Sequence, residues 1–361
     1  MKNIVSGILN GFHRLFARQI DLNIRDNATY HEKEIGIVLS YAASEKISVQ
    51  EAAKQLKELG YDVPSGDDVL YHLHKQKHKQ EDLEKGFRGI IAGTLREAKK
   101  RRLLWKLLDV AIDFNGVPWY GKLLSFIVKG EKKEGTNRFI CFATLSIVVS
   151  GERFIIDAVP FTLLAGKKKA VQELLESTNR YGIRIRRVML DRGFYDVSVV
   201  NLLNNRVGYL IPAVRTKGIK RAIRELEEKG ECITGYTMKS ATGKTATCTL
   251  FIIWDEEKER WLPFITNLSV DKRNRETLAD AYRKRWGIET SYRMKNQFKA
   301  KTCSRCYAVR YVLYMLSLCM YNLWVLLNII HAEYLGVTPA EPTITVDRFI
   351  FQIRRIIYNA G

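Results

Sequence analysis

The sequence has little cysteine and no evident leader segment, and both shortages bear on where the protein works. Six cysteines scattered over 361 residues do not form a disulfide framework. The basic first residues hold no unbroken apolar run, because Asn10, His13 and Arg14 interrupt it, so no secretory signal is predicted. We therefore expect the protein in the reducing environment of the cytoplasm.

Acidic residues are also in short supply, 39 against 59 basic ones, which gives a formal net charge of +20. The positive charge is spread along the chain and is not gathered in one tail. Such a chain favours a polyanionic partner, and nucleic acid is the commonest one. An anionic membrane surface is the alternative.

Long uncharged runs are rare, and residues 311–330 are the one exception. Twenty residues without a charge are long enough to cross a bilayer. However, Ser317, Asn322 and Asn328 interrupt the run, and tyrosines recur through its middle. We predict a helix buried in protein and no association with a membrane.

Residues 1–104 are predicted to form an N-terminal helical DNA-binding domain. Ser48 and Glu51 fit a capping box, Gly60 fits a helix end, and a second helix start follows at Ser65. Two short helices joined in this way resemble a helix-turn-helix, which suggests recognition of DNA ends. A helical bundle with a solvated basic face explains the pattern equally well. The basic residues in question are His72, His74, Lys75, Lys77, His78 and Lys79.

A different pattern begins near residue 105. It predicts three strands, then a helix, a strand, a helix and a strand, at 107–114, 137–149, 153–159, 167–181, 186–190, 197–205 and 207–213. The first strand is expected to end at Asp113 and turn at Asn115-Gly116. This order is typical of the ribonuclease H-like fold, an α/β fold with a mixed five-stranded sheet and helices.

The predicted core, residues 105–214, is interrupted and then resumes. Alternating Thr-, Gly- and Lys-rich segments predict a β-rich insertion at 215–272. The second part of the core, 273–335, would contain a helix at 282–299 and the apolar helix. A tail at 336–361 follows, with a loop at Pro339 and Pro342 and a final amphipathic helix from about 346 to 358.

Two aspartates mark the ends of predicted neighbouring strands. Asp113 ends the first strand and Asp191 follows the fourth, so their carboxylates are expected at one edge of the sheet. Glu289, a lone acid among cations, lies on the helix at 282–299. Three carboxylates suit Mg²⁺, and two such ions about 3.5–4 Å apart support phosphodiester hydrolysis and strand transfer. Asp109 and Asp196 are the rival acids.

Three segments in this order resemble the catalytic blocks of the DDE transposases of bacterial and archaeal insertion sequences. They are IDFNGVPWYG around Asp113, LDRGFYD around Asp191, and YRKRWGIETSYRMKNQ around Glu289. The branch that this chain resembles has a β-rich insertion before the glutamate. The resemblance extends over roughly residues 105–335.

That branch also has a signature of Tyr, Arg, Glu and Lys at fixed spacing. Tyr282, Arg285 and Glu289 match it, whereas Asn296 occupies the lysine position and Lys295 lies one residue earlier. Lys295 or Lys299 could take over the role of the missing lysine.

The resemblance implies Asp113, Asp191 and Glu289 as catalytic metal ligands, with Mg²⁺ as the cofactor, or Mn²⁺ in its place. It implies double-stranded DNA as the partner, both the transposon ends and the target. It also implies a homodimer in the synaptic complex and a cytoplasmic, nucleoid-associated location. Candidate DNA-binding residues are Tyr282, Arg285, Tyr292, Arg293, Lys295 and Lys299. A nuclease of the same fold and a DNA-binding descendant without catalysis are the alternatives.

Two further features have competing interpretations. Trp254 and Trp261 lie in the insertion, where related enzymes with a hairpin step stack an aromatic ring on a flipped base. Packing within the insertion is the alternative and the favoured one. Cys303 and Cys306 form a lone CxxC, which is weak evidence for a metal site without further ligands.

Overall fold

The computed structural model describes residues 2–149, 151–338 and 341–358. The chain divides into two compact units. Unit 1 comprises Met1–Leu103, Ser150–Ile155 and Thr290–Gly361, and unit 2 comprises Leu104–Val149 and Ile156–Glu289. Each unit is described separately below.

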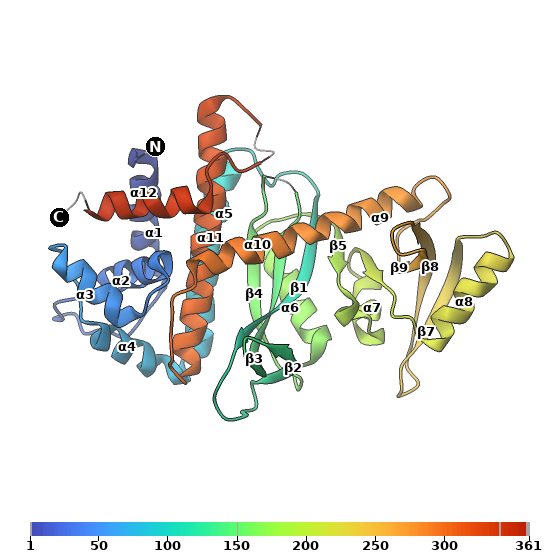
Figure 1. Cartoon of the computed structure of the whole chain (residues 1–361), viewed down its shortest axis with the longest axis horizontal. Helices are drawn as coiled ribbons and strands as arrows, with labels where there is room; N and C mark the ends of the chain where they lie inside the picture. Colours follow the sequence, from blue (N-terminus) through green and yellow to red (C-terminus); the bar gives the residue numbers. More distant parts are fainter. Residues whose placement is uncertain (1, 150, 339–340, 359–361) are drawn as a thin grey trace. The chain divides into compact units, whose positions relative to one another are not determined.

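Unit 1 is helical, and its first helices are drawn in blue in Figure 1. The predicted helix starts are confirmed, because Ser48 Oγ accepts a hydrogen bond from Glu51 N at 3.2 Å and Ser65 Oγ accepts one from Asp68 N at 3.1 Å. Gly60 adopts a φ of +84° where the third helix ends, as predicted. The elements are α1 (Lys2–Gln19), α2 (Glu32–Glu45), α3 (Val49–Glu58), α4 (Gly66–Lys75), η1 (Gln76–His78) and α5 (Gln80–Lys100).

The basic segment around α4 is largely solvated. His72 is partly buried near Asp68, whereas the side chains that follow it are exposed, namely His74, Lys75, Lys77, His78 and Lys79. Recognition of DNA ends by α3 and α4 stays a prediction.

The apolar segment forms α11 (Tyr307–Leu335), a helix buried over most of its length. It is long and apolar enough to cross a membrane, but 94% of its most apolar window is buried in protein. Asn322 Oδ1 accepts a hydrogen bond from Ile155 N at 2.9 Å, and Asn322 Nδ2 donates one to Ile155 O at 2.8 Å. Asn328 Oδ1 similarly accepts from Ile344 N at 2.7 Å. The polar residues that interrupted the apolar run therefore bind backbone groups.

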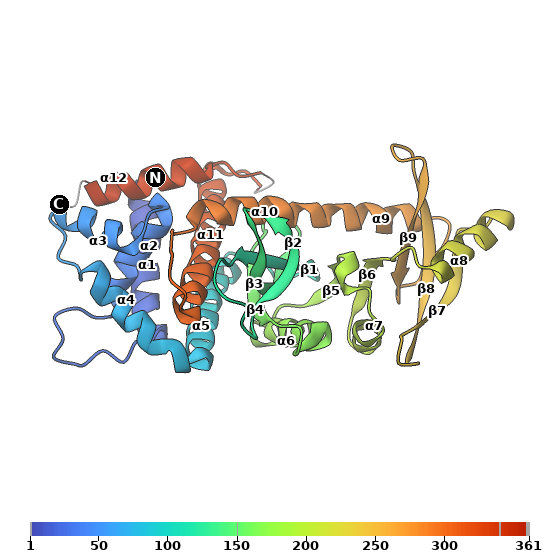
Figure 2. The ribbon, with the colours of Figure 1, turned by 60° about the horizontal axis from the view of Figure 1, so that its bottom comes forward.

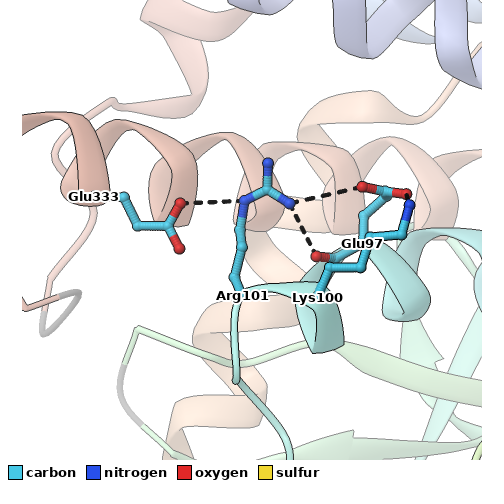
Figure 3. A network of polar contacts seen from close by, with 4 residues as sticks. All are labelled: Glu97, Lys100, Arg101 and Glu333. Atoms are coloured by element: carbon cyan, nitrogen blue, oxygen red, sulfur yellow. Dashed lines mark hydrogen bonds and ion pairs between the residues drawn. The ribbon is translucent and has the colours of Figure 1, made fainter.

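A polar network joins the end of α5 to the end of α11 (Figure 3). Arg101 Nε lies 3.2 Å from Glu333 Oε2, and Arg101 Nη1 donates to Glu97 O at 3.0 Å. Lys100 Nζ pairs with Glu97 Oε1 at 2.7 Å. The basic residues near 100 therefore belong to the end of α5, which extends to Lys100.

The final helix, α12 (Val346–Tyr358), has the predicted bounds. Its apolar side packs within unit 1, where Phe349 contacts Phe298 with ring centroids 5.9 Å apart. Pro339 of the predicted loop lies outside the described residues.

Unit 2 is built on a twisted sheet whose central strands are green in Figure 1. The path of paired strands runs β2-β3-β1-β5-β6-β9-β8-β7, and β4 also pairs with β3. β1 pairs with β3 antiparallel and with β5 parallel, and β5 pairs with β6 parallel. This is the ribonuclease H-like order, with strands β1 (Leu108–Pro118), β2 (Val128–Lys133), β3 (Thr136–Ile147), β4 (Ile155–Phe161), β5 (Ile185–Leu190) and β6 (Gly208–Pro212), and helices α6 (Gly166–Arg180), α7 (Val197–Asn204) and, between them, η2 (Arg192–Phe194).

The predicted turn at Asn115-Gly116 was wrong. β1 continues through both residues to Pro118, because Asn115 pairs with Phe142 and Gly116 pairs with Cys141 on β3. The turn tendency of an Asn-Gly pair is thus overridden by tertiary strand pairing.

The insertion is β-rich, as predicted, and also contains a helix that was not predicted, α8 (Lys217–Glu228). Its strands are β7 (Ile233–Lys239), β8 (Thr245–Asp255) and β9 (Arg260–Thr266), and Figure 2 shows β7 and β8 as a long hairpin. β9 pairs antiparallel with β6, with Ile211 opposite Ile265. The insertion therefore extends the core sheet.

The segment predicted as one helix from 282 to 299 is broken into shorter pieces. It consists of the end of α9 (Arg275–Arg283), the 3₁₀ helix η3 (Lys284–Trp286), α10 (Gly287–Lys295) and the 3₁₀ helix η4 (Asn296–Phe298). The division between the two units falls within α10, after Glu289.

The Asn322 hydrogen bonds generate the first prediction. Replacing Asn322 with Leu leaves the N–H and C=O of Ile155 buried without partners, and each such group costs about 1–3 kcal/mol. We expect the free energy of unfolding, measured by chemical denaturation, to fall by about 3 kcal/mol. Glu333→Gln is the control on the same helix, because its half-exposed ion pair contributes less than about 1 kcal/mol. Equal stability of the two variants would contradict the role of Asn322.

Candidate active site

The register between β1 and β5 brings two predicted catalytic acids to the same sheet edge. Ile112 pairs with Leu190 in the parallel ladder, and Asp113 and Asp191 are the next residue of each strand. The parallel pairing ends there, while β1 continues alongside β3. Two carboxylates from chain segments 78 positions apart are thus placed side by side.

One cation lies beside these acids and forms an ion pair with Asp113. Arg285 Nη1 is 3.2 Å from Asp113 Oδ2, and both side chains are largely buried, with 9% and 15% exposed respectively. The positive charge of Arg285 also favours the ionised form of Asp191, against the effect of burial on its pKa, so this guanidinium acts on both acids. Arg285 in turn lies over the ring of Tyr282, with Cζ 5.4 Å from the ring centroid.

The acids are held in surroundings that penalise negative charge. The pKa of Asp113 is raised to about 6, chiefly by burial and then by the charge of Asp191, while Arg285 opposes the rise. The pKa of Asp191 is also raised, chiefly by burial, and the positive charge of Arg285 again opposes the rise. Two closely placed, partly desolvated carboxylates of this kind favour the binding of a cation.

Glu289 occupies the first turn of α10 and is exposed. Its charge contributes to the raised pKa of Asp113, so the third predicted acid acts electrostatically on the first. Nevertheless, within the ranges that the structure describes, no three His, Cys, Asp or Glu side chains form a group that could hold a metal ion.

The donor set is suited to a hard divalent ion. Asp191 Oδ1 is buried and forms no well-aligned hydrogen bond, although the backbone N–H groups of Gly193 and Phe194 lie near this carboxyl, so its oxygen can still serve as a ligand beside Asp113. Mg²⁺ is usually held by one or two carboxylates together with substrate phosphates, not by a cage made only of protein ligands. Asp113 and Asp191 therefore fit such an ion, with Glu289 as a nearby third acid.

Three phenylalanines pack beside the two aspartates, one of which lies within β1 and the other directly after β5. The Phe114 ring stacks on Phe194 at 4.4 Å with an interplanar angle of 8°, and it contacts Phe161 at 4.5 Å. Phe114 follows Asp113 directly, and Phe194 lies three residues after Asp191. Sequence analysis did not single out this cluster, although its members stand next to the acids in the sequence.

The rival acids have other partners. Asp109 is buried and accepts two hydrogen bonds from Arg186, both at 2.8 Å, and one from Arg187 at 2.8 Å. Asp196 caps α7, where its side chain accepts from Ser198 N at 2.8 Å and Val199 N at 3.3 Å. Both acids thus have structural roles that account for them.

The predicted DNA-binding residues fall into two groups. In unit 2, Tyr282 and Arg285 lie against the acids, and burial raises the pKa of Tyr282 to about 12. In unit 1, Arg293 and Lys299 are exposed, whereas Tyr292 and Lys295 are buried.

Lys295 is enclosed more completely than a phosphate-binding lysine is expected to be. Its ammonium lies 4.1 Å from the centroid of the Tyr314 ring and 5.8 Å from that of Tyr292. Burial lowers the pKa of Lys295 to about 7, with a further contribution from Lys299. Its predicted contact with DNA stays untested.

The remaining candidate features have ordinary packing partners. Trp254 and Trp261 pair across β8 and β9, with ring centroids 5.2 Å apart and Trp254 46% exposed. Cys303 and Cys306 are both free thiols.

Comparison with known proteins agrees with this geometry. A family model described as the transposase DDE domain matches residues 105–323, more than half of the chain. The chain therefore belongs to the transposase DDE-domain family. No curated protein matches the sequence.

A solved structure shares the fold. The piggyBac transposase, determined by cryo-electron microscopy as a synaptic complex with hairpin DNA, is 12% identical to this chain with a TM-score of 0.55. The match covers 98% of this chain and 77% of the other. It supports the ribonuclease H-like core with its insertion.

The contact between Arg285 and Asp113 generates the second prediction. Arg285→Gln removes the nearby positive charge that favours the ionised carboxyl, so the pKa of Asp113 should rise above about 6, by roughly one pH unit. Carboxyl NMR titration of the metal-free protein measures this value. Arg283→Gln is the matched control, because Arg283 is exposed and pairs with Asp280. A pKa that stays at about 6 in Arg285→Gln would show that the guanidinium does not act on Asp113.

Proposed function

We propose that this chain is a transposase that binds the inverted ends of its own insertion sequence, cuts the DNA and joins the ends to target DNA. The supporting observation is the side-by-side placement of Asp113 and Asp191 by the register of β1 and β5, with Arg285 paired to Asp113. Membership of the transposase DDE-domain family supports the same reaction class.

In this proposal Asp113, Asp191 and Glu289 hold two Mg²⁺ ions, or Mn²⁺ in their place. When bound, such ions activate a water or a 3′-hydroxyl and stabilise the leaving oxygen of the phosphodiester. The buried Asp191 Oδ1 and the charge repulsion between the two aspartates are the features of this chain that favour their binding.

The cationic residues orient the DNA. Arg285 offers a planar guanidinium that can contact a phosphate while it neutralises Asp113, and the Tyr282 hydroxyl beside it adds a hydrogen-bonding group. Arg293 and Lys299 are exposed and can bind backbone phosphates. Lys299 suits the role of the missing signature lysine better than Lys295, which is buried.

Two DNA ends must be held together for both to be joined to one target. We infer a homodimer in the synaptic complex, acting in the cytoplasm at the nucleoid. The net charge of +20 supports an extensive contact with DNA and predicts that binding weakens steeply with salt.

Substitution of Asp191 tests the catalytic assignment. Asp191→Asn keeps the shape of the side chain but removes the ligand charge, so metal-dependent cleavage of end DNA should fall by more than about 100-fold. Asp196→Asn is the matched control, because asparagine caps a helix as well as aspartate and Asp196 is not assigned to the site. Cleavage that persists in Asp191→Asn, or that is lost equally in both variants, would refute the assignment.

Joining is tested separately from cutting. With a donor plasmid carrying both ends and a target plasmid, we expect Mg²⁺-dependent products in which the two are covalently linked. Cleaved donor without joined products would identify a nuclease of this fold instead. DNA binding with neither cleavage nor joining would identify a non-catalytic descendant of a transposase.

A further inference from the structure

Two adjacent leucines between β4 and α6 are strongly exposed. Leu163 is 72% exposed and Leu164 is 89% exposed, the latter the highest value among the exposed large apolar side chains of the described residues. Single exposed leucines are common, but two at consecutive positions form an apolar projection. Such a projection suggests an apolar partner outside the chain.

The turn that carries the leucines is closed by its own hydrogen bonds. Thr162 Oγ1 accepts from Ala165 N at 3.2 Å, and Thr162 O accepts from Gly166 N at 3.2 Å. Gly166 adopts a φ of +75°, a conformation that glycine tolerates without strain. The leucines are thus presented on a defined turn.

The turn is connected by aromatic contacts to the two segments that carry Asp113 and Asp191. Phe161 immediately precedes it and contacts Phe114 at 4.5 Å, and Phe114 stacks on Phe194. Phe114 is adjacent to Asp113, and Phe194 lies three residues beyond Asp191. One aromatic cluster therefore connects the two segments that carry the acids with the end of β4, which leads into the leucine turn.

Cations follow the leucines directly. Lys167, Lys168 and Lys169 open α6, and Lys168 and Lys169 are exposed. An apolar projection beside a cluster of lysines matches a ligand with both phosphates and apolar faces.

We propose that Leu163 and Leu164 form a wedge that packs against the bases next to the cut and holds that base pair open. Base faces are accessible to aliphatic side chains only where a duplex is unstacked, and inserted leucines are a known means of unstacking. The neighbouring lysines favour DNA over an uncharged protein partner. This inference rests on the proposed function, because it takes a DNA end as the ligand.

The experiment uses the full-length protein and two DNA duplexes. Each duplex carries one inverted end of the element, taken from the DNA that flanks the coding sequence. One duplex is fully paired and contains 2-aminopurine at the base pair next to the cut, and the other is mismatched at that base pair. Unstacking on binding is followed by 2-aminopurine fluorescence in a buffer that contains Ca²⁺ in place of Mg²⁺. The rate of cutting is measured in a buffer that contains Mg²⁺.

We expect the double variant Leu163→Ser/Leu164→Ser to lose the fluorescence rise that the wild-type protein produces. It should cut the paired end about tenfold more slowly than the wild-type protein, because unstacking is no longer assisted. It should cut the mismatched end within about twofold of the wild-type rate, since that end is already open.

Leu123→Ser/Leu124→Ser is the matched control. These leucines are also adjacent and exposed, by 50% and 44%, in the loop after β1, and they should leave fluorescence and both cutting rates unchanged. Rescue on the mismatched end alone distinguishes a wedge from a merely structural role.

Several outcomes would overturn the wedge while leaving the proposed function intact. They are wild-type cutting without a fluorescence rise, equal slowing of the double variant on both duplexes, and a loss of dimer in the double variant with fluorescence unchanged. Conversely, a wild-type protein that raises fluorescence through the leucines but cuts neither duplex would refute the proposed function and support the wedge.

Discussion

Parallel hydrogen bonding between β1 and β5 is the constraint on which the candidate site depends. Because successive side chains on a strand point to opposite faces, a slip of one residue would turn Asp113 away from Asp191. The register shifts between Leu108 and Asp109, and Asp109 is bound there by Arg186 and Arg187 of β5. This ion-pair cluster, in which Asp109 is buried and Arg186 is half-exposed, ties β1 to β5 near the start of the ladder, and Asp113 and Asp191 follow its other end.

Charge balance is the second constraint. Burial raises the pKa of both aspartates, the charge of Asp191 raises the pKa of Asp113 further, and the charge of Arg285 opposes the rise at both. The same guanidinium lies over Tyr282, whose ring also contacts Phe264 of β9 at 5.2 Å. The position of Arg285 is therefore tied to the sheet as well as to the acids, so the helix that carries the signature and the strands that carry the aspartates form one arrangement within unit 2.

Much of this arrangement could be predicted from the sequence, because the order of the strands and the acids at positions 113 and 191 follow from local patterns. The pairing of Asp113 with Asp191 needed only the expected sheet topology. The predicted end of the first strand before Asn115-Gly116 was wrong, because these two residues pair with residues of β3 that are distant in the sequence. Helix α8 was not predicted, because the residues that follow it alternate between polar and apolar side chains as in strands. Its own apolar residues do follow helical spacing, namely Ile219, Ala222, Ile223 and Leu226.

Other features could not be read from local patterns at all. The burial of Lys295 depends on the ring of Tyr314, a residue of a different helix. The contact of Phe161 with Phe114 joins two strands that are not neighbours in the sheet. Side-chain environments of this kind arise from packing between distant segments, so a periodicity argument cannot reach them.

The join between β6 and β9 determines how the chain can be engineered. Residues 211 and 265 share a ladder, so removing the whole insertion would uncover the backbone edge of β6 and create a site for intermolecular strand addition. By contrast, the exposed turn between β7 and β8 closes on itself through Ser240 N and Lys244 O at 2.8 Å. A fluorophore or an affinity tag is better introduced at that tip, where no paired strand would be lost.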